Sequence, residues 1–132
     1  MNRRTFFLSL PACALPGVLS AYQAEIYAPA TWRDMKQAHP KIILNWRASW
    51  SLTCQIKETL LTDLLAENPA YGSLTFVDVD WDTFGQSQWA QRLKIERRST
   101  LVALSGDTEL ARVVNEPYAH KLRNFLDAAL NA

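Results

Sequence analysis

The residues best able to do chemistry lie together in one short segment of the chain. The segment consists of Trp50, Ser51, Leu52, Thr53 and Cys54. A cysteine thiol can exchange disulfides once it is ionised. A serine hydroxyl is a weak nucleophile without an adjacent base, and His39 and His120 both lie outside the segment. Ser51 is, however, a good residue to begin a helix. The sequence therefore predicts Ser51 as a helix cap and Cys54 as the candidate reactive residue.

Three roles remain open for Cys54. It can be an inert packing residue, because a covered thiol without a charged partner behaves as a small apolar group. It can instead be a thiol that a partner's cysteine or a small disulfide reaches. A metal ligand is the third role, but one cysteine with no histidine or second cysteine nearby falls short of a metal site. We therefore expect no metal, and the sequence indicates no cofactor.

Two predicted elements must position this segment. Residues 41–46 form a short apolar run, which is typical of a strand covered on both faces. A helix is predicted from about Ser51 to Asn68, where Pro69 follows. Its apolar residues at helical spacing are Ile56, Leu60, Leu61, Leu64 and Leu65. The candidate residues thus lie at the bend between a central strand and a long helix.

The rest of the chain predicts an α/β fold. A helix is expected over 31–39, capped by Thr31, and a buried strand over 74–80. A loop at 71–72 precedes that strand, and a turn at 82–86 and a short helix at 87–94 follow it. The last elements are a strand at 100–104, a hairpin partner at 109–114 and a helix that begins at Pro117. Strand–helix–strand units favour parallel pairing, and the hairpin adds an antiparallel edge. The expected result is a central mixed β-sheet flanked by helices on both faces.

The first 21 residues have the pattern of an export signal. Arg3 and Arg4 precede an apolar stretch over 6–19, and small residues follow it. The arginine pair resembles a twin-arginine signal, with an ordinary export signal or a retained segment as alternatives. The stretch before Cys13 is similar to a lipoprotein cleavage box, but it is short and interrupted by proline, so we expect no lipid anchor. The predicted organisation is a signal at 1–21 and one domain at 22–132, exported to the periplasm.

Composition and charge restrict the partners. Hydrophobic residues make up 48% of the 132 residues, enough for one core. Without residues 1–21 the net charge is −1, which gives no support for nucleic acid or an anionic membrane as partner. That portion contains Cys54 as its single cysteine, so it cannot form an internal disulfide. The sequence gives no oligomeric state.

The segment at the strand–helix joint resembles the thioredoxin family, in which a buried strand leads into a Trp-Cys-x-x-Cys turn that opens a helix. Trp50 matches the tryptophan, Cys54 matches the second cysteine, and Ser51 occupies the place of the first, attacking cysteine. Residues 77–80, Val-Asp-Val-Asp, are similar to the family's next core strand. The resemblance covers roughly residues 25–132. It implies a thioredoxin-like fold and a partner that is a polypeptide or a thiol-containing protein.

Two further positions depart from the family pattern. Asn45 occupies the place of a buried aspartate that assists proton transfer, and an amide cannot take up that proton. Ser99 occupies the place of a cis-proline that shapes the substrate groove. A cis bond before a residue other than proline costs about 2.5–4 kcal/mol, so we expect a trans bond between Arg98 and Ser99. The resemblance places a binding groove around Trp50, Arg98, Ser99 and Thr100.

The aromatic and basic residues allow two interpretations each. Trp46 is expected in the core and Trp50 beside the groove. Trp81 and Trp89 either cover the end of the sheet or line a ligand site. Arg97 and Arg98 are either a solvated pair or a source of positive charge at the groove rim.

The sequence supports two functions of different classes, and a third interpretation is a decayed member of a redox family that is kept for no strong function. The first is a periplasmic, non-catalytic module that binds an extended polypeptide or acts like a chaperone. The second is a monothiol protein that exchanges disulfides through Cys54 with an external thiol. A dithiol–disulfide oxidoreductase is not expected, because exchange and release require two thiols.

Overall fold

The computed structural model describes residues 22–132. The predicted export signal at 1–21, with its arginine pair and Cys13, lies outside the described residues. No helix between residues 22 and 132 combines the length and the apolar character needed to cross a bilayer.

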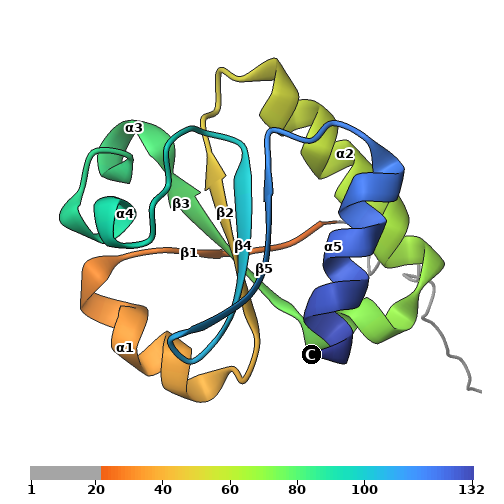
Figure 1. The fold of residues 1–132 in the computed structure, drawn as a ribbon, viewed down its shortest axis with the longest axis horizontal. Helices are drawn as coiled ribbons and strands as arrows, with labels where there is room; N and C mark the ends of the chain where they lie inside the picture. Colours follow the sequence, from red (N-terminus) through yellow and green to blue (C-terminus); the bar gives the residue numbers. More distant parts are fainter. Residues whose placement is uncertain (1–21) are drawn as a thin grey trace, which may run out of the picture.

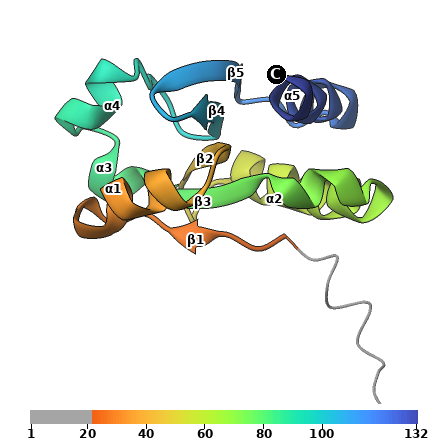
Figure 2. The same ribbon diagram turned by 90° about the horizontal axis from the view of Figure 1, so that it is seen from below.

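A five-stranded mixed sheet forms the centre of the fold (Figure 1). Its strands are β1 (Glu25–Ile26), β2 (Ile42–Arg47), β3 (Thr75–Asp80), β4 (Thr100–Ser105) and β5 (Thr108–Val114). Their order across the sheet is β1-β3-β2-β4-β5. Strand β3 runs parallel to β1 and β2, whereas β4 runs antiparallel to β2 and β5. Figure 2 shows β1 and β5 at opposite edges of the sheet. The predicted mixed sheet with a terminal hairpin is confirmed.

Helices cover both faces of the sheet, as the sequence predicted. They are α1 (Pro29–Ala38), α2 (Leu52–Glu67), the 3₁₀ helix η3 (Pro69–Ser73), α3 (Trp81–Phe84), α4 (Gln88–Arg92) and α5 (Ala119–Asn131). Figure 1 shows α2 and α5 on one side of the strands and α1, α3 and α4 on the other. The site segment lies at the beginning of α2, directly after the central strand β2.

Two hydrophobic clusters join these layers. The first contains Leu61 and Leu64 of α2 together with Leu122 and Phe125 of α5, packed on one face of the sheet. The second lies on the other face around Trp46, which is fully buried as predicted. Burial of this apolar surface is the main stabilising contribution to the fold. Both clusters include side chains of β2, so the strand that precedes the site is held from both faces.

The second cluster is extended by a shell of half-buried aromatic residues. These residues are Tyr27, Trp32, Trp81, Phe84 and Trp89. Trp81 and Trp89 therefore pack against the sheet core, as the first of their two interpretations predicts, and Trp89 in addition lines a cleft.

Several boundaries differ from the sequence-based expectations. Strand β1 was not expected, because two exposed residues give no alternating pattern. Helix α1 begins at Pro29 with Ala28 as its cap, so Thr31 is not the cap, and α5 begins two residues after Pro117. The expected loop and turn at 71–72 and 82–86 contain short helices in η3 and α3. The strand–helix–strand pattern from β3 to β4 predicted parallel pairing, but β4 is antiparallel to β2. The chain returns from α3 and α4 at the end of the sheet where β3 finishes, so that Thr100, the first residue of β4, lies opposite Trp46 near the end of β2.

Candidate functional site

Ser51 begins helix α2 in the way the sequence predicted. Its backbone is extended, with φ −89° and ψ 121°, and its Oγ accepts a hydrogen bond from the Cys54 N–H at 3.3 Å. This bond satisfies one of the N–H groups that every helix leaves free at its first turn. The Ser51 side chain is buried, so its hydroxyl is a structural group in this conformation.

Cys54 lies one turn into α2, on the side that faces the sheet. Its side chain is fully buried and its thiol is free. Over residues 22–132, no cluster of histidine, cysteine, aspartate and glutamate side chains is arranged to hold a metal ion. The structure therefore places Cys54 as a covered packing residue.

Trp50 is the exposed residue of the site and is held in a fixed orientation. Its side chain is 59% exposed. Its Nε1–H donates to the Asp82 carboxylate of α3, with distances of 3.1 and 3.0 Å to the two oxygens. The Arg98 guanidinium lies over the indole, 4.9 Å from the ring centroid, in a cation–π contact. An indole held from two sides is a pre-organised flat contact surface.

Arg98 and Ser99 form the wall next to Ser51. Arg98 Nε donates to Ser51 Oγ at 3.3 Å, so the arginine covers the serine while it stacks on Trp50. The bond between Arg98 and Ser99 is trans, as expected. Ser99 has φ 62°, a left-handed conformation that non-glycine residues rarely adopt. Its N–H donates to the Trp46 carbonyl at 2.7 Å, and its own carbonyl accepts from the Asn115 N–H at 2.9 Å.

The remaining predicted groove residues are only partly at the surface. Ser99 and Thr100 are buried, and the Thr100 hydroxyl donates to the Arg97 carbonyl at 2.7 Å. Leu52 is 69% exposed and Thr53 is half-buried. The structure thus brings Trp50, Ser51 and Arg98 together, with Ser99 and Thr100 behind them.

The exposed face of α2 continues the surface away from Trp50. Ile56 was predicted as part of the apolar stripe, but it is 40% exposed. It lies in a shallow groove of about 320 Å³ that is lined by Leu52, Gln55, Ile56, Thr59 and Leu60. The stripe that faces the sheet is instead formed by Cys54, Lys57, Leu61 and Leu64. The actual buried face of α2 is therefore rotated from the predicted one, and Leu52 and Ile56 are left to solvent.

Asn45 is the centre of a buried polar network beneath the site. Its Oδ1 accepts from Lys57 Nζ at 2.6 Å. Its Nδ2 donates toward Glu58 Oε2 at 3.0 Å, Asp78 Oδ1 at 3.1 Å and Tyr22 Oη at 3.1 Å. These partners fix which end of the amide faces which charge.

Arg47 completes the network through an ion pair with Glu58. Two cations and two carboxylates, Arg47 and Lys57 with Glu58 and Asp78, therefore surround one neutral amide. This balance explains how four charged residues are accommodated close to the core, where an unpaired charge is costly.

The network perturbs the titration of its members. Burial lowers the pKa of Lys57 to about 8, opposed by the negative groups around it. Burial also raises the pKa of Asp78, and burial together with the charge of Asp78 raises the pKa of Tyr22. Hydrogen bonding to Glu58 raises the pKa of Arg47 further. The pKa of Lys57 thereby comes into the mildly alkaline range.

Sequence reasoning missed Lys57 altogether. Lysine is almost never fully buried, yet this one is completely covered. Its spacing could have indicated the burial. Lys57 lies three residues after Cys54 and four before Leu61, and residues at this spacing share one face of a helix.

Known proteins that are similar to this chain in sequence or in structure are thioredoxins and thioredoxin-like proteins. No family model matches the chain. A thioredoxin H2-2 from Oryza sativa subsp. japonica is 27% identical over 94 residues, which cover 67% of this chain and 66% of that protein. The chain thus spans slightly less than two thirds of this relative's length.

Solved structures that resemble this one are also thioredoxin-like. Trxlp from Edwardsiella tarda has 27% identity and a TM-score of 0.67, covering 79% of this chain and 98% of that one. A thioredoxin from Malassezia sympodialis has 19% identity and a TM-score of 0.66, covering 82% and 91%. The fold and the strand–helix joint therefore define a thioredoxin-like protein. The chain belongs to the thioredoxin-like superfamily, and its fold is similar to that of proteins of the thiol–disulfide oxidoreductase type.

Proposed function

We propose that this chain is an exported thioredoxin-like protein that lacks the attacking cysteine and binds an extended polypeptide segment without covalent chemistry. The observation that supports this most directly is the contrast between Trp50 and Cys54. The tryptophan is exposed and held in place, whereas the thiol is fully buried. The surface is therefore suited to contact and not to disulfide exchange.

The loss of attack follows from the chemistry of Ser51. By its place in the motif, Ser51 substitutes for the cysteine whose thiolate attacks a disulfide in thioredoxins. A hydroxyl is far less acidic than a thiol and cannot form a disulfide. Its hydrogen bonds with the Cys54 N–H and Arg98 Nε give it a structural role instead.

The surface around Trp50 offers both apolar and polar contacts to a polypeptide. Leu52 and Ile56, on the first turns of α2, present exposed apolar side chains. Within residues 22–132, the N–H and carbonyl of Arg98 make no hydrogen bond, so both groups are free to pair with an extended strand. An aromatic anchor with adjacent backbone groups is a common way to bind an extended segment.

The proposed location is the periplasm, reached through the signal at residues 1–21. Its arginine pair favours the twin-arginine route, and an ordinary export signal is the alternative. Blocking of each export route in a bacterial host, followed by fractionation, distinguishes them. Retention of the full-length chain in the cytoplasm under all conditions would contradict the export proposal.

Binding is tested with a reduced and alkylated protein, which is permanently unfolded and has no free thiol. We expect reversible binding that Trp50→Ala weakens by about tenfold or more, because an exposed aromatic anchor commonly dominates such a contact. Ile26→Ala is the matched control, since Ile26 is 71% exposed on the far edge strand β1. Calorimetric titration measures both variants. Equal affinity of Trp50→Ala and the parent would contradict the proposed surface.

The monothiol alternative is tested by alkylation of Cys54 in the folded protein. Because the side chain is fully buried, reaction requires local or global opening of the structure. We expect iodoacetamide to label the folded protein at least roughly 100-fold more slowly than the same protein in denaturant. Mass spectrometry follows both rates. Similar rates in the two states would favour a reachable thiol and hence the monothiol function.

A further inference from the structure

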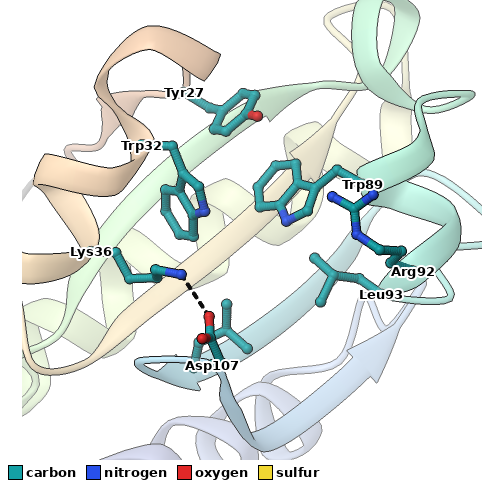
Figure 3. A pocket seen from close by; sticks show the side chains of 8 residues that line it. Tyr27, Trp32, Lys36, Trp89, Arg92, Leu93 and Asp107 are labelled. Carbon is teal, nitrogen blue, oxygen red and sulfur yellow. Dashed lines mark hydrogen bonds and ion pairs between the residues drawn. The ribbon is translucent and has the colours of Figure 1, made fainter.

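The face of the sheet opposite α2 contains an aromatic cleft of about 410 Å³. Figure 3 shows side chains from three parts of the chain around it: Tyr27 and Trp32 from α1 and the residues before it, Trp89 and Arg92 from α4, and Asp107 from the β4–β5 turn. None of the residues that line the cleft belongs to the surface around Trp50. Its volume lies within the range of small-molecule sites, about 300–1,000 Å³.

Aromatic rings form the walls of the cleft and hold one another in position. Tyr27 stacks on Trp89, with ring centroids 4.4 Å apart and planes 16° from parallel. Trp32 lies 5.2 Å from Trp89 in a tilted arrangement. Behind them, the buried Trp46 ring packs 5.1 Å from Trp89. The walls are therefore anchored to the core, which favours a pre-formed site.

The rim of the cleft carries two positive side chains, Lys36 and Arg92, and one negative side chain, Asp107. Lys36 Nζ forms an ion pair with Asp107 at 2.6 Å, shown as a dashed line in Figure 3. Arg92 makes no ion pair or side-chain hydrogen bond with any residue between 22 and 132. The lining consequently has one positive charge in excess, and that charge is not neutralised by the protein.

The Tyr27 hydroxyl is a second polar group of the cleft. Burial raises the pKa of Tyr27, and the nearby charge of Arg92 partly opposes this effect. The phenol therefore stays neutral around pH 7 and can donate a hydrogen bond. Within residues 22–132 the Tyr27 hydroxyl makes no hydrogen bond to a protein group.

We propose that this cleft binds a small planar aromatic carboxylate, with the ring against Trp32 and Trp89 and the carboxylate paired with Arg92. Aromatic walls favour a flat ring through stacking and edge contacts. A guanidinium binds a carboxylate through two parallel N–H donors, which fixes orientation as well as charge. The excess positive charge repels an organic cation, although aromatic cages can otherwise accept one.

The test uses 2-naphthoate as the probe and 2-naphthamide as its neutral analogue. Nuclear magnetic resonance of the indole N–H groups distinguishes this cleft from the surface around Trp50. We expect naphthoate to shift the Trp32 and Trp89 signals and leave that of Trp50 unchanged. The amide should bind about tenfold more weakly, because it loses the charge-assisted pair.

Two exposed arginines provide the variant and its control. Arg92→Gln should reduce the affinity for naphthoate to that for the amide, whereas Arg97→Gln, on the neighbouring loop, should leave it unchanged. The proposal is overturned if Trp50 is the residue that responds, if amide and carboxylate bind equally, if Arg92→Gln binds like the parent, or if no indole signal shifts. These outcomes are independent of polypeptide binding, since the cleft and the Trp50 surface have no residue in common.

Discussion

Replacement of Asn45 by aspartate is expected to destabilise the folded protein by about 3 kcal/mol at pH 7, the order of magnitude for disruption of a buried charged network. This substitution restores the acid that the thioredoxin family has at this place, so the sequence alone would suggest a mild effect. The structure predicts the opposite, because the amide Nδ2 faces the carboxylates of Glu58 and Asp78. Aspartate would turn two hydrogen bonds into two repulsions.

The pairing of the introduced carboxylate with Lys57 offsets only part of this loss. Lys57 already donates to the Oδ1 of Asn45, so no new contact forms. Three carboxylates would then share the site with two cations, and like charges raise the pKa of at least one of them. The destabilisation should therefore shrink as the pH falls and that carboxylate takes up a proton.

Urea unfolding between pH 5 and 8 measures the effect. Asn68→Asp is the matched control, because Asn68 caps η3 with its Oδ1 and aspartate caps equally well. We expect a change of no more than about 0.5 kcal/mol for the control. An Asn45→Asp variant as stable as the parent at pH 7 would show that the network does not depend on the amide.

The backbone framework could be predicted from the sequence because its signals are local. The apolar run of β2 and the Ser51 cap of α2 each depend on a few adjacent residues, and both are found in the structure. The same is true of the hairpin turn at Gly106, where φ is 61°. By contrast, β1 exists only because β3 offers it a parallel edge, with Glu25 opposite Val77. Two exposed residues have no hydrophobic pattern from which such a pairing could be predicted.

The polar network could not be predicted, because its members come from four separate parts of the chain. Tyr22, Asn45, Lys57 and Asp78 lie in the N-terminal segment, β2, α2 and β3. Hydrophobic patterning assigns lysine to the solvent, and the predicted stripe of α2 was rotated accordingly. The position of Asn45 was correctly singled out, but its partners depend on the register of β2 against β3, in which Asn45 lies opposite Asp78.

The stability of the protein is expected to rise between pH 7 and pH 10 on account of Lys57. Burial lowers its pKa to about 8 in the folded protein, from an ordinary value of 10.5. Below pH 8 the amine is charged in both states, and burying that charge costs about 3 kcal/mol. Between the two pKa values the unfolded chain binds more protons than the folded one, so stability increases with pH. Above 10.5 the amine is neutral in both states and the cost disappears.

Lys57→Met isolates this contribution. Methionine removes the ammonium but leaves the Asn45 Oδ1 without a donor, so the absolute stability at one pH is not the informative quantity. The informative quantity is the stability of the variant minus that of the parent. We expect it to fall by about 2 kcal/mol from pH 7 to pH 10, as the parent loses the cost of its buried charge.

The titratable and polar groups that face Lys57 limit the pH range in which the stability difference reports on Lys57 alone. They are Cys54 and Glu58 on α2, Arg47 and Asn45 on β2, Asp78 on β3, and Tyr22. Taking the difference between variant and parent removes the contributions that both proteins share. Above pH 10 the raised pKa of Tyr22 acts with the opposite sign, since the unfolded phenol loses its proton first.

Lys121→Met, at an exposed position on α5, is the control, and its difference from the parent should stay constant with pH. If the Lys57→Met difference is equally constant, then Lys57 is not charged and buried at neutral pH. The balance of charges around Asn45, in which Lys57 and Glu58 of α2 take part, would then be wrong. If the difference falls as expected, this superfamily member has a buried amine bonded to an amide at the place where the family resemblance implies a carboxyl group.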